Sequence, residues 1–267
     1  MIEGINVNVP EAAYHAFSAV SKSTLWKFAK NPHKWLLTKD EAMAPTASMN
    51  WGSLVDCCLL QPQELSQCFA VSSFADFRTK EAQAWRDSQT VPIVTLAQVA
   101  EAKKAADLIR AHHFAGAILD GATAQVSALV EGVEEKTGER FKGKCRIDIV
   151  PDAAGAFGDW LVDLKTTQSI SKLPATIAEF GYHAQAAWYL DMFNAASGEN
   201  RTRWGFVFQE SEPPYEIAVI ELDADSIAKG REWYLTALEK WCQSHKTGNF
   251  PNPFDDEIRV ISIPKWA

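Results

Sequence analysis

The sequence predicts an α/β fold in which a mixed central sheet is flanked by helices. Residues 144–167 read as two strands joined by a turn, because β-branched and apolar residues alternate on both sides of a segment rich in Pro, Gly and Ala. In the second half of the chain, helical stretches alternate with further strand-like segments. The length of 267 residues and the hydrophobic content of 47% suit one large domain with a full core. We therefore expect a single domain over residues 1–267.

We expect residues 1–20 to form a loose lead-in to the first helix. Ser21 or Ser23 can cap this helix, which should run to about Lys30, where an Asn-Pro pair ends it. Under one interpretation the lysines of this segment are the solvated side chains of a surface helix. Under the other, Ser21, Ser23 and Lys22 receive a DNA phosphate at the helix N-terminus.

An apolar helix over residues 51–60 contains a carboxylate, Asp56. A carboxylate is expensive to bury without a partner. We therefore expect Asp56 to meet a metal ion, an arginine or hydrogen-bond donors, unless it lies at the helix boundary and reaches water.

A polar segment comes next, in which residues 77–80 lead into a short helix over residues 81–87. It can be a solvated connector. Alternatively, Arg78 and Lys80 grip the DNA backbone or its 5′ end.

Thr95 opens a further helix that runs to about His113, with Gln98 in the capping-box position. His112 and His113 have no acidic or cysteine partner at ligand spacing. We therefore expect a helix end there and not a zinc site.

Three strands are expected to form an antiparallel meander, namely residues 124–131, 139–150 and 161–167. Because side chains two residues apart share one face of a strand, the last two strands each have a charged face and an apolar face. The charged faces hold Lys144, Arg146 and Asp148 on one strand, and Asp163 and Lys165 on the next. The opposite faces hold Cys145, Ile147 and Ile149, and Val162 and Leu164.

If these two strands pair, two carboxylates and one lysine converge. Asp148 and Asp163 are hard oxygen ligands that suit Mg²⁺ or Mn²⁺. Such an ion can polarise a phosphodiester and lower the pKa of a bound water. Lys165 can position that water or stabilise the developing charge. The alternative is a solvated hairpin face that carries an Asp-x-Lys by chance.

The remaining elements are a helical stretch over 172–196, strands over 203–210 and 215–222, a helix from Asp225 to about Lys246, and an irregular tail over 250–267. Tyr182, Gln185 and Tyr189 share one face of the first of these helices. We favour core packing for the two tyrosines, with contact to DNA as the alternative for Tyr189. For Gln185 we expect a role in orienting a water, Lys165 or a phosphate.

Several motifs occur in a defined order along the chain: Val20–Leu25 (VSKSTL), Trp51–Pro62 (WGSLVDCCLLQP), Cys145–Asp148 (CRID), Asp163–Thr167 (DLKTT), Tyr182–Gln185 (YHAQ) and Ile263–Ala267 (IPKWA). Gln185 and Tyr189 also form a Gln-xxx-Tyr pattern. This ordered set resembles the RecE-type exonucleases (exonuclease VIII and its phage relatives). These belong to the RecB-like branch of the PD-(D/E)xK nuclease superfamily.

The resemblance implies a PD-(D/E)xK core and a Mg²⁺-dependent exonuclease, with Mn²⁺ as a possible substitute. It further implies 5′ to 3′ digestion of linear double-stranded DNA, a 3′ single strand passed to an annealing protein, and a ring-shaped homo-oligomer of three or four subunits. The site residues that it implies are Lys165 and Gln185 for catalysis, the carboxylates of Asp148 and Asp163 with the Leu164 carbonyl for the metal, and Asp56 and Glu131 as further ligands. Gln125 is an alternative to Glu131, and Asp56 stands where the family usually has a histidine.

The composition limits the possible function classes. Lys and Arg number 26 against 34 Asp and Glu, so the net charge of −8 has the wrong sign for a simple basic DNA-binding module. A ring with a basic lumen would reconcile this charge with DNA binding. Positive charge gathers in two clusters: Lys22, Lys27, Lys30, Lys34 and Lys39, and then Lys136, Arg140, Lys142, Lys144 and Arg146, of which Arg146 is a DNA-binding candidate.

The five cysteines include no CxxC, which argues against a disulfide scaffold, a zinc ribbon and an iron–sulfur cluster. No signal peptide or membrane-length apolar run is visible, so we expect a cytoplasmic protein of a bacterial host cell and no membrane partner. Two rival functions remain. One is a PD-(D/E)xK endonuclease of restriction or repair type, and the other is a non-catalytic DNA-binding module.

Overall fold

The computed structural model describes residues 1–41, 45–254, 258 and 260–263. Six strands form the central sheet in the order β1-β4-β5-β6-β7-β8. Their bounds are β1 Gly4–Asn6, β4 Thr123–Val133, β5 Arg140–Val150, β6 Trp160–Thr167, β7 Arg203–Glu210 and β8 Ile217–Leu222. Neighbouring strands are antiparallel except for β6 and β7, which run parallel. The predicted mixed α/β sheet and its antiparallel meander β4-β5-β6 are confirmed.

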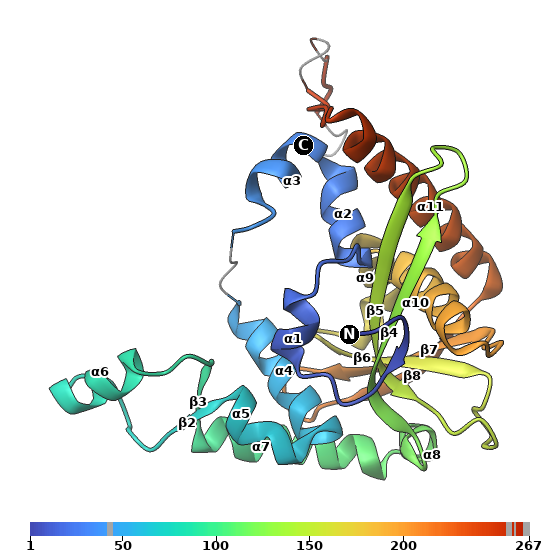
Figure 1. The fold of residues 1–267 in the computed structure, drawn as a ribbon. Helices are drawn as coiled ribbons and strands as arrows, with labels where there is room; N and C mark the ends of the chain where they lie inside the picture. The colour runs from blue at the N-terminus through green and yellow to red at the C-terminus, as the bar shows by residue number, and fades with distance from the viewer. Residues whose placement is uncertain (42–44, 255–257, 259, 264–267) are drawn as a thin grey trace.

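Helices cover both faces of this sheet (Figure 1). The helices of the described residues are α1 Glu11–Ala16, α2 Lys22–Lys30, α3 Pro32–Thr38, α4 Ala47–Leu60, α5 Leu65–Cys68, α6 Lys80–Asp87, α7 Leu96–Ala111, α8 His113–Leu119, α9 Leu173–Glu179, α10 Tyr182–Ser197 and α11 Ala224–Thr247. Side chains from α2, α10 and α11 share one buried core with the sheet. Side chains from α4, α7 and α8 share a second core on the opposite face.

Strand alternation divides the apolar residues between these two cores. On β7, Phe206 and Phe208 pack under α10, whereas Val207 packs on the side of α4 and α7. All three are fully buried. Burial of one such side chain stabilises the fold by about 1.5–3 kcal/mol relative to exposure. The continuous apolar run of β7 is therefore explained by a strand that is covered on both faces.

Capping residues fix several helix ends where the sequence predicts them. Ser21 caps α2, with its side chain accepting a hydrogen bond from the backbone N–H of Thr24. Thr95 and Gln98 form the expected capping box of α7. His112 ends α7 and caps α8, accepting from the N–H of Ala115 at 3.3 Å, so the helix-end interpretation of this histidine is confirmed.

The expectation of a loose lead-in over residues 1–20 is wrong. Strand β1 pairs with β4 at the edge of the sheet, and α1 follows it. The buried ammonium of Lys144 holds this segment, donating to the carbonyl oxygens of Tyr14 and Phe17, both at 2.7 Å. Lys144 therefore has a structural role, although the sequence analysis placed it in a cluster of basic residues.

Two further features differ from the expectation. The helical stretch predicted over 172–196 is broken at Phe180-Gly181 into α9 and α10, because Gly181 has φ +62°. A small parallel sheet, β2 Ala70–Ser72 with β3 Ile93–Thr95, forms the base of an arm that contains α6 and projects from the body (Figure 1). These strands have three residues each, too few for a period to be recognised.

The described part of the tail from Phe250 onward has no helix or strand, and residues 264–267 of the IPKWA motif lie outside the described residues. Among the described residues, no helix combines the length and the apolar character that crossing a membrane requires.

Candidate active site

The two predicted carboxylates meet where β5 and β6 pair. Ile149 is the register partner of Val162, so Asp148 and Asp163 are the next residues to face each other across the two strands. An oxygen of the Asp148 carboxylate, Oδ2, accepts the backbone N–H of Leu164 at 2.9 Å. The two strands therefore bring both acids to one place.

Asp163 lies at the back of this site and is only 2% exposed. Its Oδ1 accepts the side-chain amide of Gln185, on α10, at 2.6 Å. Its Oδ2 contacts the ammonium of Lys165 and accepts no other hydrogen bond from the described residues. Gln185 thus orients Asp163, whereas the sequence had suggested a water, a phosphate or Lys165 as its target.

A break in strand alternation lies at Asp148. Cys145 and Ile147 pack in the core under α10, as predicted, but Ile149 packs on the side of α4 and α7. The expectation that Ile149 shares their face is therefore wrong. On β4 the residue opposite Asp148 is Gln125, whose φ of +53° departs from extended backbone. Both strands are irregular at the same level, and this irregularity places Asp148 beside Asp163.

Helix α4 supplies a third carboxylate, Asp56. The helix approaches β6 closely at Gly52, where an added Cβ would lie 3.0 Å from Oγ1 of Thr166. Asp56 Oδ2 accepts the side-chain amide of Gln125 at 2.9 Å, and Gln125 Oε1 accepts from Nε of Arg146 at 2.6 Å. As expected for a carboxylate in an apolar helix, the half-buried Asp56 has a hydrogen-bond donor, and that donor is held by an arginine.

The electrostatics of the site follow from three carboxyls and one ammonium in a poorly solvated place. Burial, together with the charge of Asp163, raises the pKa of Asp56 to about 7. Burial and the charges of Asp163 and Asp56 raise the pKa of Asp148 well above its usual range. Burial alone would lower the pKa of Lys165, but the carboxylates of Asp163 and Asp148 outweigh it and raise that pKa. Further positive charge would stabilise this cluster.

The donor set fits a hard divalent cation. Besides contacting Asp163 Oδ2, the Lys165 ammonium lies 3.5 Å from the Leu164 carbonyl oxygen, so these oxygens already hold a positive charge. Carboxylate and carbonyl oxygens suit Mg²⁺ or Mn²⁺ and are poor ligands for softer metals. Among the described residues, no three His, Cys, Asp or Glu side chains are close enough to form a metal site by themselves. A cation here would therefore rely on the Leu164 carbonyl and on water as well as on the acids.

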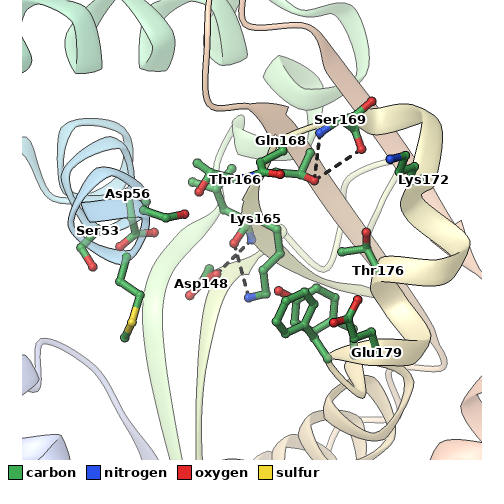
Figure 2. A pocket seen from close by; sticks show the side chains of 17 residues that line it. Ser53, Asp56, Asp148, Lys165, Thr166, Gln168, Ser169, Lys172, Thr176 and Glu179 are labelled. Atoms are coloured by element: carbon green, nitrogen blue, oxygen red, sulfur yellow. Dashed lines mark hydrogen bonds between the residues drawn. The ribbon is translucent and has the colours of Figure 1, made fainter. Parts of the chain in front are cut away.

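Two hollows meet at Asp56 and Asp148. The first, of about 850 Å³, lies between α4 and α9, and the second, of about 770 Å³, lies beside α1 and contains Arg146 and Gln125. Figure 2 shows the first hollow, with Ser53 and Asp56 on one side, Asp148 and Lys165 between, and a helix bearing Lys172, Thr176 and Glu179 on the other side. Hollows of this size can admit a nucleic-acid strand next to the carboxylates.

Glu131 lies elsewhere, so its proposed role as a metal ligand is wrong. It pairs in register with Lys142 and forms ion pairs with Lys142 at 2.6 Å and Arg140 at 3.6 Å. Lys142 precedes Asp148 by six residues of strand, or about 20 Å. Gln125, the alternative weighed for this place, is the β4 side chain that reaches the site.

The candidate DNA-binding residues are scattered. Lys22 is buried, donates to the Phe180 carbonyl at 2.6 Å, and has its pKa lowered to about 8 by burial and by the nearby Lys165. Ser23 is exposed on α2. Arg78 and Lys80 are exposed on the projecting arm and line neither hollow.

Tyr189 also lines neither hollow. Its ring packs edge-on against Trp204 at 5.7 Å between centroids. The packing interpretation of Tyr189 is therefore confirmed, and its contact with DNA stays a prediction.

Sequence reasoning missed the side of the first hollow formed by α9 and by Lys172, which directly precedes it, because nothing in the sequence distinguishes Lys172 or Thr176 from ordinary surface residues. Tyr182 packs against Phe206 and Phe208 as predicted, and its ring also faces the Lys165 ammonium at 5.3 Å and lines this hollow, which sequence reasoning did not indicate. The glycine before Tyr182 was the available signal, because a left-handed residue there starts α10 beside the strands of the site.

Comparisons with known proteins agree with this architecture. A family model described as a PDDEXK-like domain of unknown function (DUF3799) matches residues 20–255. The crystal structure of a "putative exonuclease" from Eubacterium rectale superposes with a TM-score of 0.63 at 15% identity, over 97% of this chain and 96% of that chain. The crystal structure of SSO0001 gives a TM-score of 0.31 at 17% identity, over 84% of this chain and 93% of that chain, a similarity too low to carry weight. No curated protein matches the chain in sequence.

Proposed function

The chain belongs to the PDDEXK-like family DUF3799, and on this premise we propose that it is a metal-dependent nuclease that hydrolyses phosphodiester bonds in DNA. One observation carries the proposal: Asp148, Asp163 and Lys165 converge beside a hollow of about 850 Å³. Two acids and a lysine on paired strands are the groups that a metal-assisted hydrolysis needs, since hard ligands and a cationic side chain act on the same phosphate.

The side chains divide the work as follows. Asp148, Asp163 and the Leu164 carbonyl would hold Mg²⁺ or Mn²⁺, which when bound supplies Lewis-acid activation of the phosphate and of a water. Gln185 and the Leu164 N–H keep the two carboxylates aligned through their hydrogen bonds. Lys165, 21% exposed and lining the hollow, orients the attacking water or stabilises the charge that develops on the phosphate.

The finer assignment is an exodeoxyribonuclease that acts on the ends of linear double-stranded DNA, 5′ to 3′, and leaves a 3′ single strand for an annealing protein. The order of motifs that resembles the RecE-type exonucleases supports this assignment, as does the description of the Eubacterium rectale protein as a "putative exonuclease". A homo-oligomeric ring of three or four subunits belongs to the same proposal. Such a ring would suit the net charge of −8, because only the surface that faces DNA needs to be basic.

The test is incubation of end-labelled linear duplex and closed circular duplex with Mg²⁺ or Mn²⁺. We expect the wild-type protein to degrade only the linear DNA, and Lys165→Ala to bind it without degrading it. Lys142→Ala, which alters an exposed lysine on the same strand as Asp148, is the matched control and should degrade DNA like wild type.

Cutting of closed circles would favour an endonuclease instead. If the wild-type protein binds DNA and leaves it intact with both metals, the chain is a non-catalytic DNA-binding module.

A further inference from the structure

An exposed aromatic ring stands at the edge of the first hollow. Phe180, between α9 and α10, is 52% exposed and lines this hollow. On its inner side it stacks on Tyr182, with 5.7 Å between ring centroids and 22° between ring planes. One face of the Phe180 ring is therefore covered by the ring of Tyr182, and the other part of the ring faces solvent.

The backbone that carries this ring is held firmly. Lys22 donates to the Phe180 carbonyl oxygen at 2.6 Å, and the Phe180 N–H donates to the Thr176 carbonyl at 3.1 Å. Gly181 follows with φ +62°, and an added Cβ there would lie 2.2 Å from the ring of Trp26. An exposed phenylalanine that only filled space would gain little stability from such a fixed backbone. The rigid support therefore suggests that the position of the ring matters.

The ring is also close to the reacting groups. Tyr182 connects the two, since its ring lies 5.7 Å from Phe180 and 5.3 Å from the Lys165 ammonium. Lys172 lines the same hollow, and Met49, which is 47% exposed, lines it from α4. A ligand that reaches from Lys165 to Phe180 thus meets a cation at one end and a flat apolar face at the other.

We propose that Phe180, supported by Tyr182, is a stacking platform for a nucleobase of the DNA strand whose phosphate lies at Lys165. A nucleotide has this chemistry, an anionic phosphate joined through a sugar to a flat aromatic ring. Aromatic side chains bind single-stranded bases in this way, with little dependence on sequence because every base has a π-face. The inference rests on the proposed nuclease function and adds a base-binding site to it.

The platform should keep an unpaired terminal base next to the site. A base in a duplex is already stacked on its neighbours, so a ring beside the scissile phosphate binds the strand best when that base has left the helix. We therefore expect Phe180 to bind the strand under attack after local unpairing.

The experiment measures stacking directly under conditions in which the protein does not cleave. The wild-type parent and its variants are studied in EDTA, which prevents cleavage and keeps Lys165 in place, and the probe is a linear duplex with 2-aminopurine placed in turn at each of the first positions from the end. The parent protein should quench the fluorescence at one of these positions. Phe180→Ala should abolish this quenching and weaken binding by about tenfold or more, the effect of losing one base stack. Phe180→Trp should retain both.

Phe114→Ala is the matched control, because Phe114 on α8 is 55% exposed and does not line the first hollow. It should quench and bind like the parent. Equal quenching by Phe180→Ala and Phe114→Ala would overturn the platform while leaving the nuclease proposal intact. A lower subunit number for Phe180→Ala in light scattering would also overturn it, because the ring would then be a contact between copies. Absence of both DNA binding and cleavage in the wild-type protein would instead refute the proposed function itself.

Discussion

Replacing Asp56 with asparagine should stabilise the metal-free protein at alkaline pH. Asp56 is ionised above about pH 7, where it shares a buried site with the carboxyls of Asp163 and Asp148. Asparagine has nearly the same shape, and its side-chain oxygen can still accept the Gln125 amide that Asp56 accepts now at 2.9 Å. The substitution therefore removes a like charge and keeps the hydrogen bond.

The size of the effect follows from the pKa of Asp56, which is raised from 3.8 to about 7. This difference is about 3 pKa units, or at most about 4 kcal/mol in the free energy of unfolding. Solvent in the adjoining hollows screens part of it, so we expect a gain of about 2 kcal/mol at pH 8. Because the folded state binds the proton more tightly, Asp56 makes the wild-type protein lose stability as pH rises from about 4 to 7, and at pH 5 the gain should be only about a third of its value at pH 8.

The assay is urea unfolding in the presence of EDTA, at pH 5 and at pH 8, with Asp120→Asn as a control at an exposed aspartate. The control should change stability little at either pH. A loss of stability for Asp56→Asn at pH 8, or an equal gain at both pH values, would refute the electrostatic account of the site.

Three further substitutions and one control variant test the other assignments made above. Gln185→Ala leaves Asp163 Oδ1 buried without its donor, so it should lower the free energy of unfolding by about 1–3 kcal/mol and also lower kcat. The control is Gln209→Ala, which removes another buried amide that donates to a backbone carbonyl. In urea melts and rate assays it should lower stability without lowering kcat. Equal loss of kcat in both variants would count against a positioning role for Gln185. Glu131→Gln should change the rate of DNA degradation less than twofold, since this side chain pairs with an exposed lysine and an exposed arginine. A large loss of rate would show that Glu131 takes part in the active site after all. Gly52→Ala should reduce kcat several-fold with little change in Tm, because a Cβ 3.0 Å from Thr166 Oγ1 pushes α4 from the strand, and an unchanged rate would show that this close approach does not matter.

Much of the fold could be predicted because its signals are local. Polar and apolar residues alternate along the strand that contains Asp163 and Lys165, and this pattern predicts which face each side chain takes. The Thr95–Gln98 capping box is recognisable as two residues at a fixed spacing. Residue type also predicted that Asp56 would need a partner in an apolar helix. In each case the physical cause lies within one turn of helix or one strand.

Other parts could not be predicted because their cause lies in distant residues. Nothing near Glu131 distinguishes it from Gln125; the β4–β5 register decides which of them reaches the carboxylates. The break in alternation at Asp148 depends on a left-handed residue in the neighbouring strand. Lys144 reads as one member of a basic cluster until β1 and α1 fold over it. Such features follow from tertiary contacts, which override local patterns.

The most direct test of the active site is a titration with Mn²⁺, followed by electron paramagnetic resonance, of wild type and of Asp148→Asn, Asp163→Asn and Glu131→Gln. If Asp148 and Asp163 share one divalent ion, wild type and Glu131→Gln should bind Mn²⁺ alike, and each aspartate variant should lose most of that affinity. Equal Mn²⁺ binding by all four proteins, or none by the wild type, would contradict the shared ion on which the proposed chemistry depends.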